Sequence, residues 1–168
     1  NPATSVLLLG LGERKKWQRR RLVLAVRRAV RLLKEQRLSD AACFLPKSLT
    51  LSPQALSLTV RNILLADFEF IEYKEEPKEG WPEIKEILLI APISPPLKNA
   101  YREGLILGEE INNCRRLANL PGGMLPPRKL AEEAKRLAKI HGFKARVLGE
   151  ERMRKLGMGG VLGVAQGS

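Results

Sequence analysis

The stretch that decides how this chain is organised is residues 96–127, PLKNAYREGLILGEEINNCRRLANLPGGMLPP. Its first part has helical spacing, with Leu105, Gly108, Ile111 and Arg115 falling three or four residues apart, and predicts one long helix from Pro96 to Ala118. The following residues 119–127 are rich in Pro and Gly, which end helices and form turns. A helix of this length, followed by such a break, indicates that it connects two bodies.

Upstream of the long helix, apolar runs alternate with helical patterns. A capped helix is expected after Ser52, because Ser is a favoured N-cap residue and Pro53 suits the first helical position. The predicted elements are strands at Ser5–Leu11, Ala41–Leu45 and Glu86–Ala91, helices at Trp17–Gln36 and Ser52–Phe68, and a surface loop at Glu69–Pro82.

Downstream of the break, the spacing predicts an amphipathic helix from Pro127 to His141, which Gly142 ends as a C-cap glycine. The remaining predicted elements are a strand at Lys144–Leu148, a short helix at Glu150–Leu156 and a strand at Val161–Ala165. Alternation of strands and helices along a chain is typical of α/β folds with mostly parallel sheets. We therefore predict an α/β protein in three parts. They are a first unit at residues 1–95, a connecting helix at residues 96–118 and a second unit at residues 119–168.

The composition is that of a globular chain with a strong positive charge. The 168 residues carry 30 Lys and Arg against 18 Asp and Glu, a formal net charge of +12. The two cysteines, Cys43 and Cys114, form no C-x-x-C pair, which favours a reducing compartment. No basic n-region precedes the short apolar run from Val6 to Leu9, so no signal peptide is expected there, and no apolar run reaches the roughly 20 residues that span a bilayer. These features predict a cytoplasmic protein without a membrane partner.

The basic residues concentrate in one predicted helix, since eleven of the residues from Arg14 to Arg37 are Lys or Arg. Arg20, Arg27, Arg31 and Lys34 are placed on the face away from the apolar stripe. Such a ridge could lie along a phosphate backbone, so these four are the candidate nucleic-acid-binding residues. A solvated outer face explains the same pattern, and we favour it.

The residue inventory predicts no self-sufficient active site. Gly10-Leu11-Gly12 follows a predicted strand, but position 15 is Lys where the dinucleotide fingerprint has Gly. The single histidine, His141, sits at a helix end, where the helix dipole favours it, and has no nucleophile to pair with. The two aspartates, Asp40 and Asp67, stand in no metal-binding motif. We therefore assign no catalytic and no metal-binding residue in this chain.

Residues 103–168 carry a set of short motifs in a fixed order. They are Asn119-Leu120-Pro121, Leu130-Ala131-Glu132-Glu133-Ala134, Val147-Leu148-Gly149-Glu150, Leu156-Gly157-Met158-Gly159 and Val164-Ala165-Gln166-Gly167-Ser168. In this order and spacing they resemble the interdomain segment and the start of the catalytic domain of leucyl (cytosol) aminopeptidases. Residues 5–102 resemble the later part of that family's N-terminal domain more loosely, through a VLLLGLG segment, a long helix and an ILLADFEFIEYK segment.

The resemblance implies a function and a fold. Members of the family are hexameric exopeptidases that remove N-terminal residues, often Leu, from peptides, using two divalent metal ions such as zinc or manganese. Their N-terminal domain is macro-domain-like, so residues 1–95 would be part of such a domain and residues 119–168 the start of the catalytic domain. The family's metal ligands would follow Ser168, so this segment is expected to bind no metal and to be inactive alone. The alternative function is a DNA-binding or oligomerisation module that uses the basic helix.

Overall fold

The computed structural model describes residues 5–45, 47, 52–92 and 94–166. The chain divides into two compact units, Asn1–Asn119 and Leu120–Ser168. The first unit contains a 3₁₀ turn, Arg14–Lys16, helices α1 (Arg19–Glu35), α3 (Pro53–Asp67) and α4 (Pro95–Asn119), and strands β1 (Asp40–Phe44) and β2 (Glu86–Ile90). The second contains α5 (Pro127–His141), α6 (Glu150–Lys155) and α7 (Gly159–Ala165).

The two strands of the first unit pair in parallel, with Asp40 opposite Glu86 and Phe44 opposite Ile90. Exposure alternates along both strands, as expected when one face of a sheet is covered. Leu89 of β2 packs in the core cluster of Leu56, Val60 and Leu97. The sheet therefore rests on the helices through one face only, and the α/β class predicted from the sequence is confirmed.

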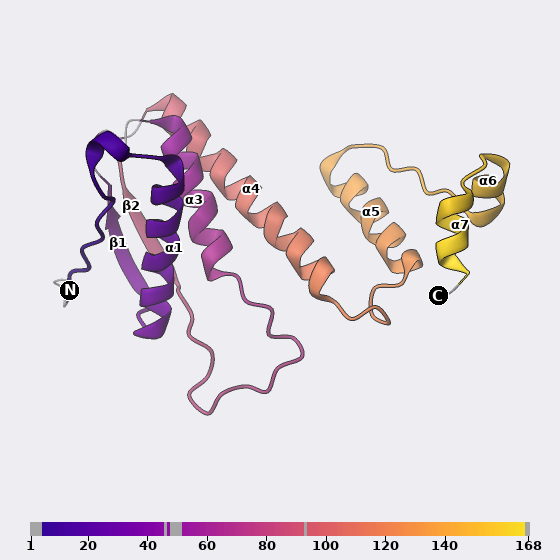
Figure 1. Ribbon diagram of the computed structural model, residues 1–168, viewed down its shortest axis with the longest axis horizontal. Coiled ribbons are helices and arrows are strands. Elements are labelled where there is room, and N and C mark those ends of the chain that lie inside the picture. The colour runs from indigo at the N-terminus through magenta and orange to yellow at the C-terminus, as the bar shows by residue number, and fades with distance from the viewer. Residues whose placement is uncertain (1–4, 46, 48–51, 93, 167–168) are drawn as a thin grey trace. The chain divides into compact units, whose positions relative to one another are not determined.

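Helix α3 lies between α1 and α4, as Figure 1 shows. It begins as predicted, because the Ser52 side chain accepts a hydrogen bond from the Ala55 backbone N–H at 3.3 Å and Pro53 occupies the first turn. One core cluster joins it to α1 through Leu22, Val26 and Ala55. Two of its buried polar side chains are bonded within the helix, since the Thr59 hydroxyl donates to the Ala55 carbonyl at 2.9 Å and the Asn62 amide donates to the Leu58 carbonyl at 2.8 Å.

The contact between α3 and α4 depends on two glycines of α4. A Cβ added at Gly104 would lie 2.7 Å from the Ser57 carbonyl oxygen and 2.8 Å from the Val60 Cβ. A Cβ added at Gly108 would lie 2.6 Å from the Leu64 Cδ1. The two helix backbones therefore approach more closely than any side chain at these positions would allow. Helix α4 itself confirms the long helix predicted from Pro96 to Ala118.

The second unit is built from the predicted amphipathic helix and two shorter ones. Helix α5 ends at His141, and Gly142 follows it in the left-handed conformation with φ of 73°, which confirms the predicted C-cap. Hydrogen bonds from Arg136 lower the pKa of the Glu133 carboxyl in this helix. Only Ala138 is buried among the described residues of this unit.

Three predicted strands are wrong. Ser5–Leu11 forms no strand, and Val6 and Leu8 are more than four-fifths exposed, because no strand among the described residues pairs with it. Lys144–Leu148 is likewise irregular. Val161–Ala165 belongs to helix α7, since a short apolar run does not by itself distinguish a strand from a helix.

Candidate functional site

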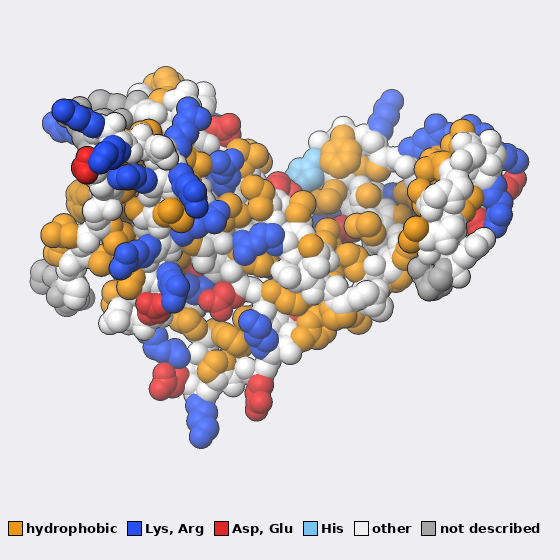
Figure 2. All heavy atoms as spheres, viewed as in Figure 1, with side chains coloured by type: hydrophobic (Ala, Val, Ile, Leu, Met, Phe, Trp, Pro, Cys, Tyr) orange, Lys and Arg blue, Asp and Glu red, His pale blue; other side chains and the backbone are white. Residues whose placement is uncertain are grey.

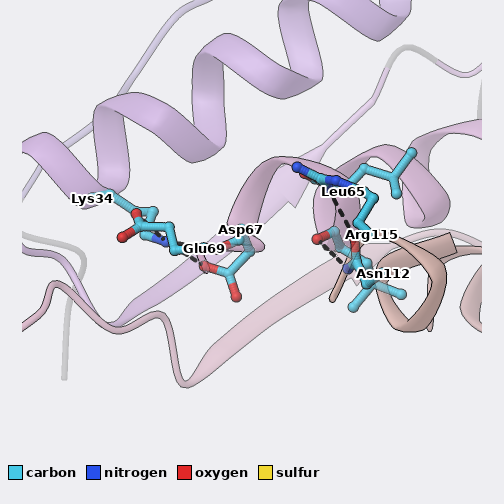
Figure 3. Close-up of polar contacts among 7 residues, drawn as sticks. Lys34, Leu65, Asp67, Glu69, Asn112 and Arg115 are labelled. Carbon is cyan, nitrogen blue, oxygen red and sulfur yellow. Dashed lines mark hydrogen bonds and ion pairs between the residues drawn. The ribbon is translucent and has the colours of Figure 1, made fainter. Parts of the chain in front are cut away.

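The C-terminal end of α3 accepts hydrogen bonds from side chains of both neighbouring helices. The last carbonyls of a helix have no partner within it, and α3 has no basic residue in its own last turn to serve them. The Leu64 carbonyl accepts from the Phe68 backbone N–H at 3.2 Å, and side chains from both neighbouring helices donate to the carbonyls at this end (Figure 3). The Asn112 amide of α4 donates to the Leu64 carbonyl at 2.9 Å, and the Lys34 ammonium of α1 donates to the Asp67 carbonyl at 2.7 Å.

Arg115 of α4 is fixed by three contacts. One Nη donates to the Leu65 carbonyl at 2.8 Å and to the Asn112 side-chain oxygen at 2.9 Å. The guanidinium also lies over the Phe68 ring, 4.3 Å from its centroid, where a cation is attracted to the aromatic face. None of these partners is a carboxylate, so the positive charge of Arg115 is not neutralised by them.

Lys34, unlike Arg115, is paired with carboxylates. Its side chain is only 11% exposed, and its ammonium forms ion pairs with Asp67 at 3.2 Å and Glu69 at 2.8 Å (Figure 3). The prediction that Lys34 belongs to the outer face of its helix is therefore wrong. Lys34 follows Val30 by four residues, and residues four apart lie on the same side of a helix, next to the buried stripe.

The other three predicted nucleic-acid-binding residues are exposed but differ in their partners. Arg31 forms an ion pair with Glu35, one turn further along α1, at 2.7 Å. Arg27 donates through Nε to the side-chain oxygen of the buried Asn62 at 2.9 Å. Arg20 is exposed in the first turn of α1. Figure 2 shows Lys and Arg side chains spread over the region that α1 occupies in Figure 1, and nucleic-acid contact by these residues stays a prediction.

An open groove of about 790 Å³ lies beside the end of α3. Helix α1 contributes Arg27, Arg31 and Lys34 to its wall, and α4 contributes Arg115. Its other polar lining residues are Glu35 and Glu69. The structure thus brings together three of the four basic residues singled out from the sequence, and it adds Arg115, which sequence reasoning missed. The spacing of Asn112 and Arg115, three residues apart on one helix, was the signal available for finding it.

The described part of the chain offers no ligand set for a metal ion. No group of three or more His, Cys, Asp or Glu side chains there could hold one. His141 is the last residue of α5, and Asp67 is engaged with Lys34. No helix among the described residues is long and apolar enough to cross a membrane.

Comparison with known proteins identifies the family to which the chain belongs. The N-terminal domain model of the cytosol aminopeptidase family matches residues 1–77, and the catalytic domain model of the same family matches residues 112–168. A probable cytosol aminopeptidase of Roseiflexus castenholzii is 35% identical over 99% of this chain, and one of Solibacter usitatus is also 35% identical over 99%. The chain therefore belongs to the cytosol aminopeptidase family, as its motifs predicted.

The match covers nearly all of this chain but only part of each relative. The chain spans about a third of the length of these two relatives, 35% and 34%. Among solved structures, the bottromycin maturation enzyme BotP in complex with Mn superposes with a TM-score of 0.70 at 21% identity, over 88% of this chain and 30% of that one. This likeness supports the fold.

Proposed function

We propose that this chain is the supporting part of a metal-dependent aminopeptidase that removes N-terminal residues from peptides. The observation that carries the proposal is the order of the two family models, with the N-terminal domain at residues 1–77 followed by the catalytic domain from residue 112. The relatives that match nearly the whole chain are named probable cytosol aminopeptidases, which suggests the same reaction for the full-length protein. Peptides with an N-terminal Leu are the proposed substrates.

The cofactors proposed for the full-length protein are two divalent ions, zinc or manganese. When bound, such ions activate water and polarise the scissile carbonyl. The described residues do not fit this role, because they form no group that could hold a metal. No step of the reaction is therefore assigned to these residues, and the proposed ligands belong to polypeptide outside this chain.

The proposed contribution of this chain is mechanical. Helix α4 has 25 residues, which corresponds to about 37 Å at the rise of an α-helix. Its middle packs closely on α3 through Gly104 and Gly108, and its C-terminal part is bonded to α3 through Asn112 and Arg115. The family match of the catalytic domain begins within this helix at residue 112, so we propose that α4 supports the start of that domain.

The test compares two proteins in one assay. The full-length protein and the 168-residue chain are purified in parallel from a host lacking its own leucyl aminopeptidase, and each is incubated with leucine p-nitroanilide and Mn²⁺. We expect the full-length protein to release nitroaniline and the 168-residue chain to release none. An inactive full-length protein with Mn²⁺ and with Zn²⁺ would refute the enzymatic proposal, and turnover by the 168-residue chain would refute its supporting role.

The same preparation tests the proposed assembly. Full-length members of the resembled family are expected to be homo-hexamers, so light scattering should give a mass six times that of one polypeptide. A monomeric mass at working concentration would contradict the hexamer without bearing on the reaction.

A further inference from the structure

Two arginines in the groove beside the end of α3 have no carboxylate partner in the part of the chain that the structure describes. Arg31 is paired with Glu35, and Lys34 with Asp67 and Glu69. Arg27 and Arg115 form no ion pair among the described residues, and they donate hydrogen bonds to neutral oxygens of Asn62, Asn112 and Leu65. We propose that this groove binds a small organic molecule through a phosphate or carboxylate group held by these two arginines.

Both guanidinium groups are held in place by neutral partners. Asn62 is buried and its amide donates to the Leu58 carbonyl at 2.8 Å, so the oxygen that accepts from Arg27 is fixed. Arg115 is fixed by the end of α3 and by the Phe68 ring. A guanidinium has five N–H donors in a fork that matches oxyanions, and the hydrogen bonds to Asn62, Leu65 and Asn112 use only a few of them. A site fixed before binding loses less conformational entropy when a ligand arrives.

The size and lining of the groove indicate the kind of molecule. Its volume of about 790 Å³ exceeds that of a bare ion and lies within the range of roughly 300 to 1,000 Å³ typical of small-molecule sites. Leu65, Ala66 and Ile111 supply an apolar wall beside the charged residues. The groove therefore fits a compact ligand with one anionic group and an apolar body. This inference does not depend on peptidase activity.

The experiment is calorimetric titration of the full-length protein with inorganic phosphate and, separately, with succinate, at low chloride. We expect saturable binding of at least one probe, weakening as chloride is added. Arg27→Gln should lower that affinity by about tenfold or more, since it removes a charge-assisted contact. The matched control is Arg28→Gln, which removes the same charge from an exposed neighbour on α1 that does not line the groove, and should change affinity by less than about twofold.

Two further variants keep the result interpretable. Arg27→Lys retains the charge but loses the fork, and should bind more weakly than the unchanged protein. Arg115→Lys removes the second fork, and its unfolding midpoint is measured first because Arg115 also caps α3. Preference for phosphate or for succinate identifies the ligand's anionic group, and either supports the site. Equal losses in Arg27→Gln and Arg28→Gln, or no heat from either probe at millimolar concentration, would overturn it.

Discussion

At the residue scale, the clearest consequence of the structure concerns Lys34. Its ammonium is mostly shielded from solvent and bonds a helix carbonyl and two carboxylates, which stabilises the fold more than a fully exposed lysine would. The Asp67 and Glu69 side chains are 41% and 39% exposed, so solvent screens their ion pairs with Lys34. If Lys34 is removed, the partner that is destabilised most is the Asp67 carbonyl, which loses its hydrogen-bond donor. Lys34 therefore acts in the structure as an external cap of α3.

We predict that Lys34→Met lowers the free energy of unfolding by about 1–3 kcal/mol, because the Asp67 carbonyl loses its donor while the aliphatic stem is retained. Chemical denaturation followed by tryptophan fluorescence measures this change. Arg28→Met, on the exposed side of the same helix, should stay within about 0.5 kcal/mol. Equal effects of the two substitutions would contradict the cap.

A second prediction at this scale concerns the cysteines. Cys114 is exposed on α4, whereas Cys43 is half-buried in β1, and burial raises the pKa of its thiol. Because the thiolate is the reactive form, Cys43 should react slowly at neutral pH and need more alkaline solution than an ordinary thiol. Timed iodoacetamide labelling with peptide mass spectrometry should show Cys114 modified first, and both modified at similar rates in denaturant. Faster labelling of Cys43 in the native protein would show that β1 is not packed as described.

At the scale of elements, the contact between α3 and α4 sets a steric limit at Gly104. Alanine there gains up to about 1 kcal/mol of helix propensity. Its Cβ would overlap the Ser57 carbonyl and Val60, and overpacking of this kind costs typically about 1–3 kcal/mol. The overlap is with backbone and a core side chain, neither of which can move freely, so the cost should dominate.

We therefore predict that Gly104→Ala lowers the thermal unfolding midpoint, measured by circular dichroism. Gly163→Ala is the control, since it also lies within a helix but has open space around its Cβ position. That substitution should leave the midpoint unchanged or raise it. Stabilisation by Gly104→Ala would mean that α3 and α4 are further apart than the structure has them.

The elements also show what the sequence could and could not predict. Helices α1, α3, α4 and α5 were predicted within two residues at each end, because caps, prolines and apolar spacing are local signals. Strands β1 and β2 were found from their apolar runs. Ser5–Leu11 and Val161–Ala165 have equally apolar sequences but form no strand, because a strand also requires a neighbour, which no local pattern encodes.

The groove illustrates the same limit for the site. Its walls come from α1, α3, α4 and the loop after α3, which are distant in sequence. The sequence shows that Arg27, Arg31 and Lys34 belong to a basic segment. No local sequence pattern indicates which of them forms ion pairs with Asp67 or Glu69. Arg115 and its cap on α3 depend on how two helices pack, and this is tertiary information.

At the scale of the whole molecule, the sheet presents an apolar face to solvent. Parallel sheets are normally covered on both faces, yet Phe44 is 75% exposed and Leu88 is 52% exposed. These side chains alternate with the covered ones along β1 and β2, so they share the uncovered face. An exposed apolar patch of this kind favours association.

We predict that the 168-residue chain binds a fluorescent apolar dye and that the double substitution Phe44→Lys, Leu88→Lys reduces the dye signal several-fold. The unfolding midpoint should change little, because neither side chain is buried in the chain. Retention of the full signal would place the dye elsewhere, for example on the exposed apolar side chains of the second unit such as Val164.

The pairing of β1 with β2 also has a consequence for biosynthesis. The two strands are joined in parallel although all of α3 and the loop that follows it lie between them in the chain. Closing so long a connection costs entropy that neighbouring elements avoid. When the polypeptide leaves the ribosome, the edge of β1 that pairs with β2 therefore stays unpaired until β2 has emerged. During that interval a chaperone that covers β1 would be most useful.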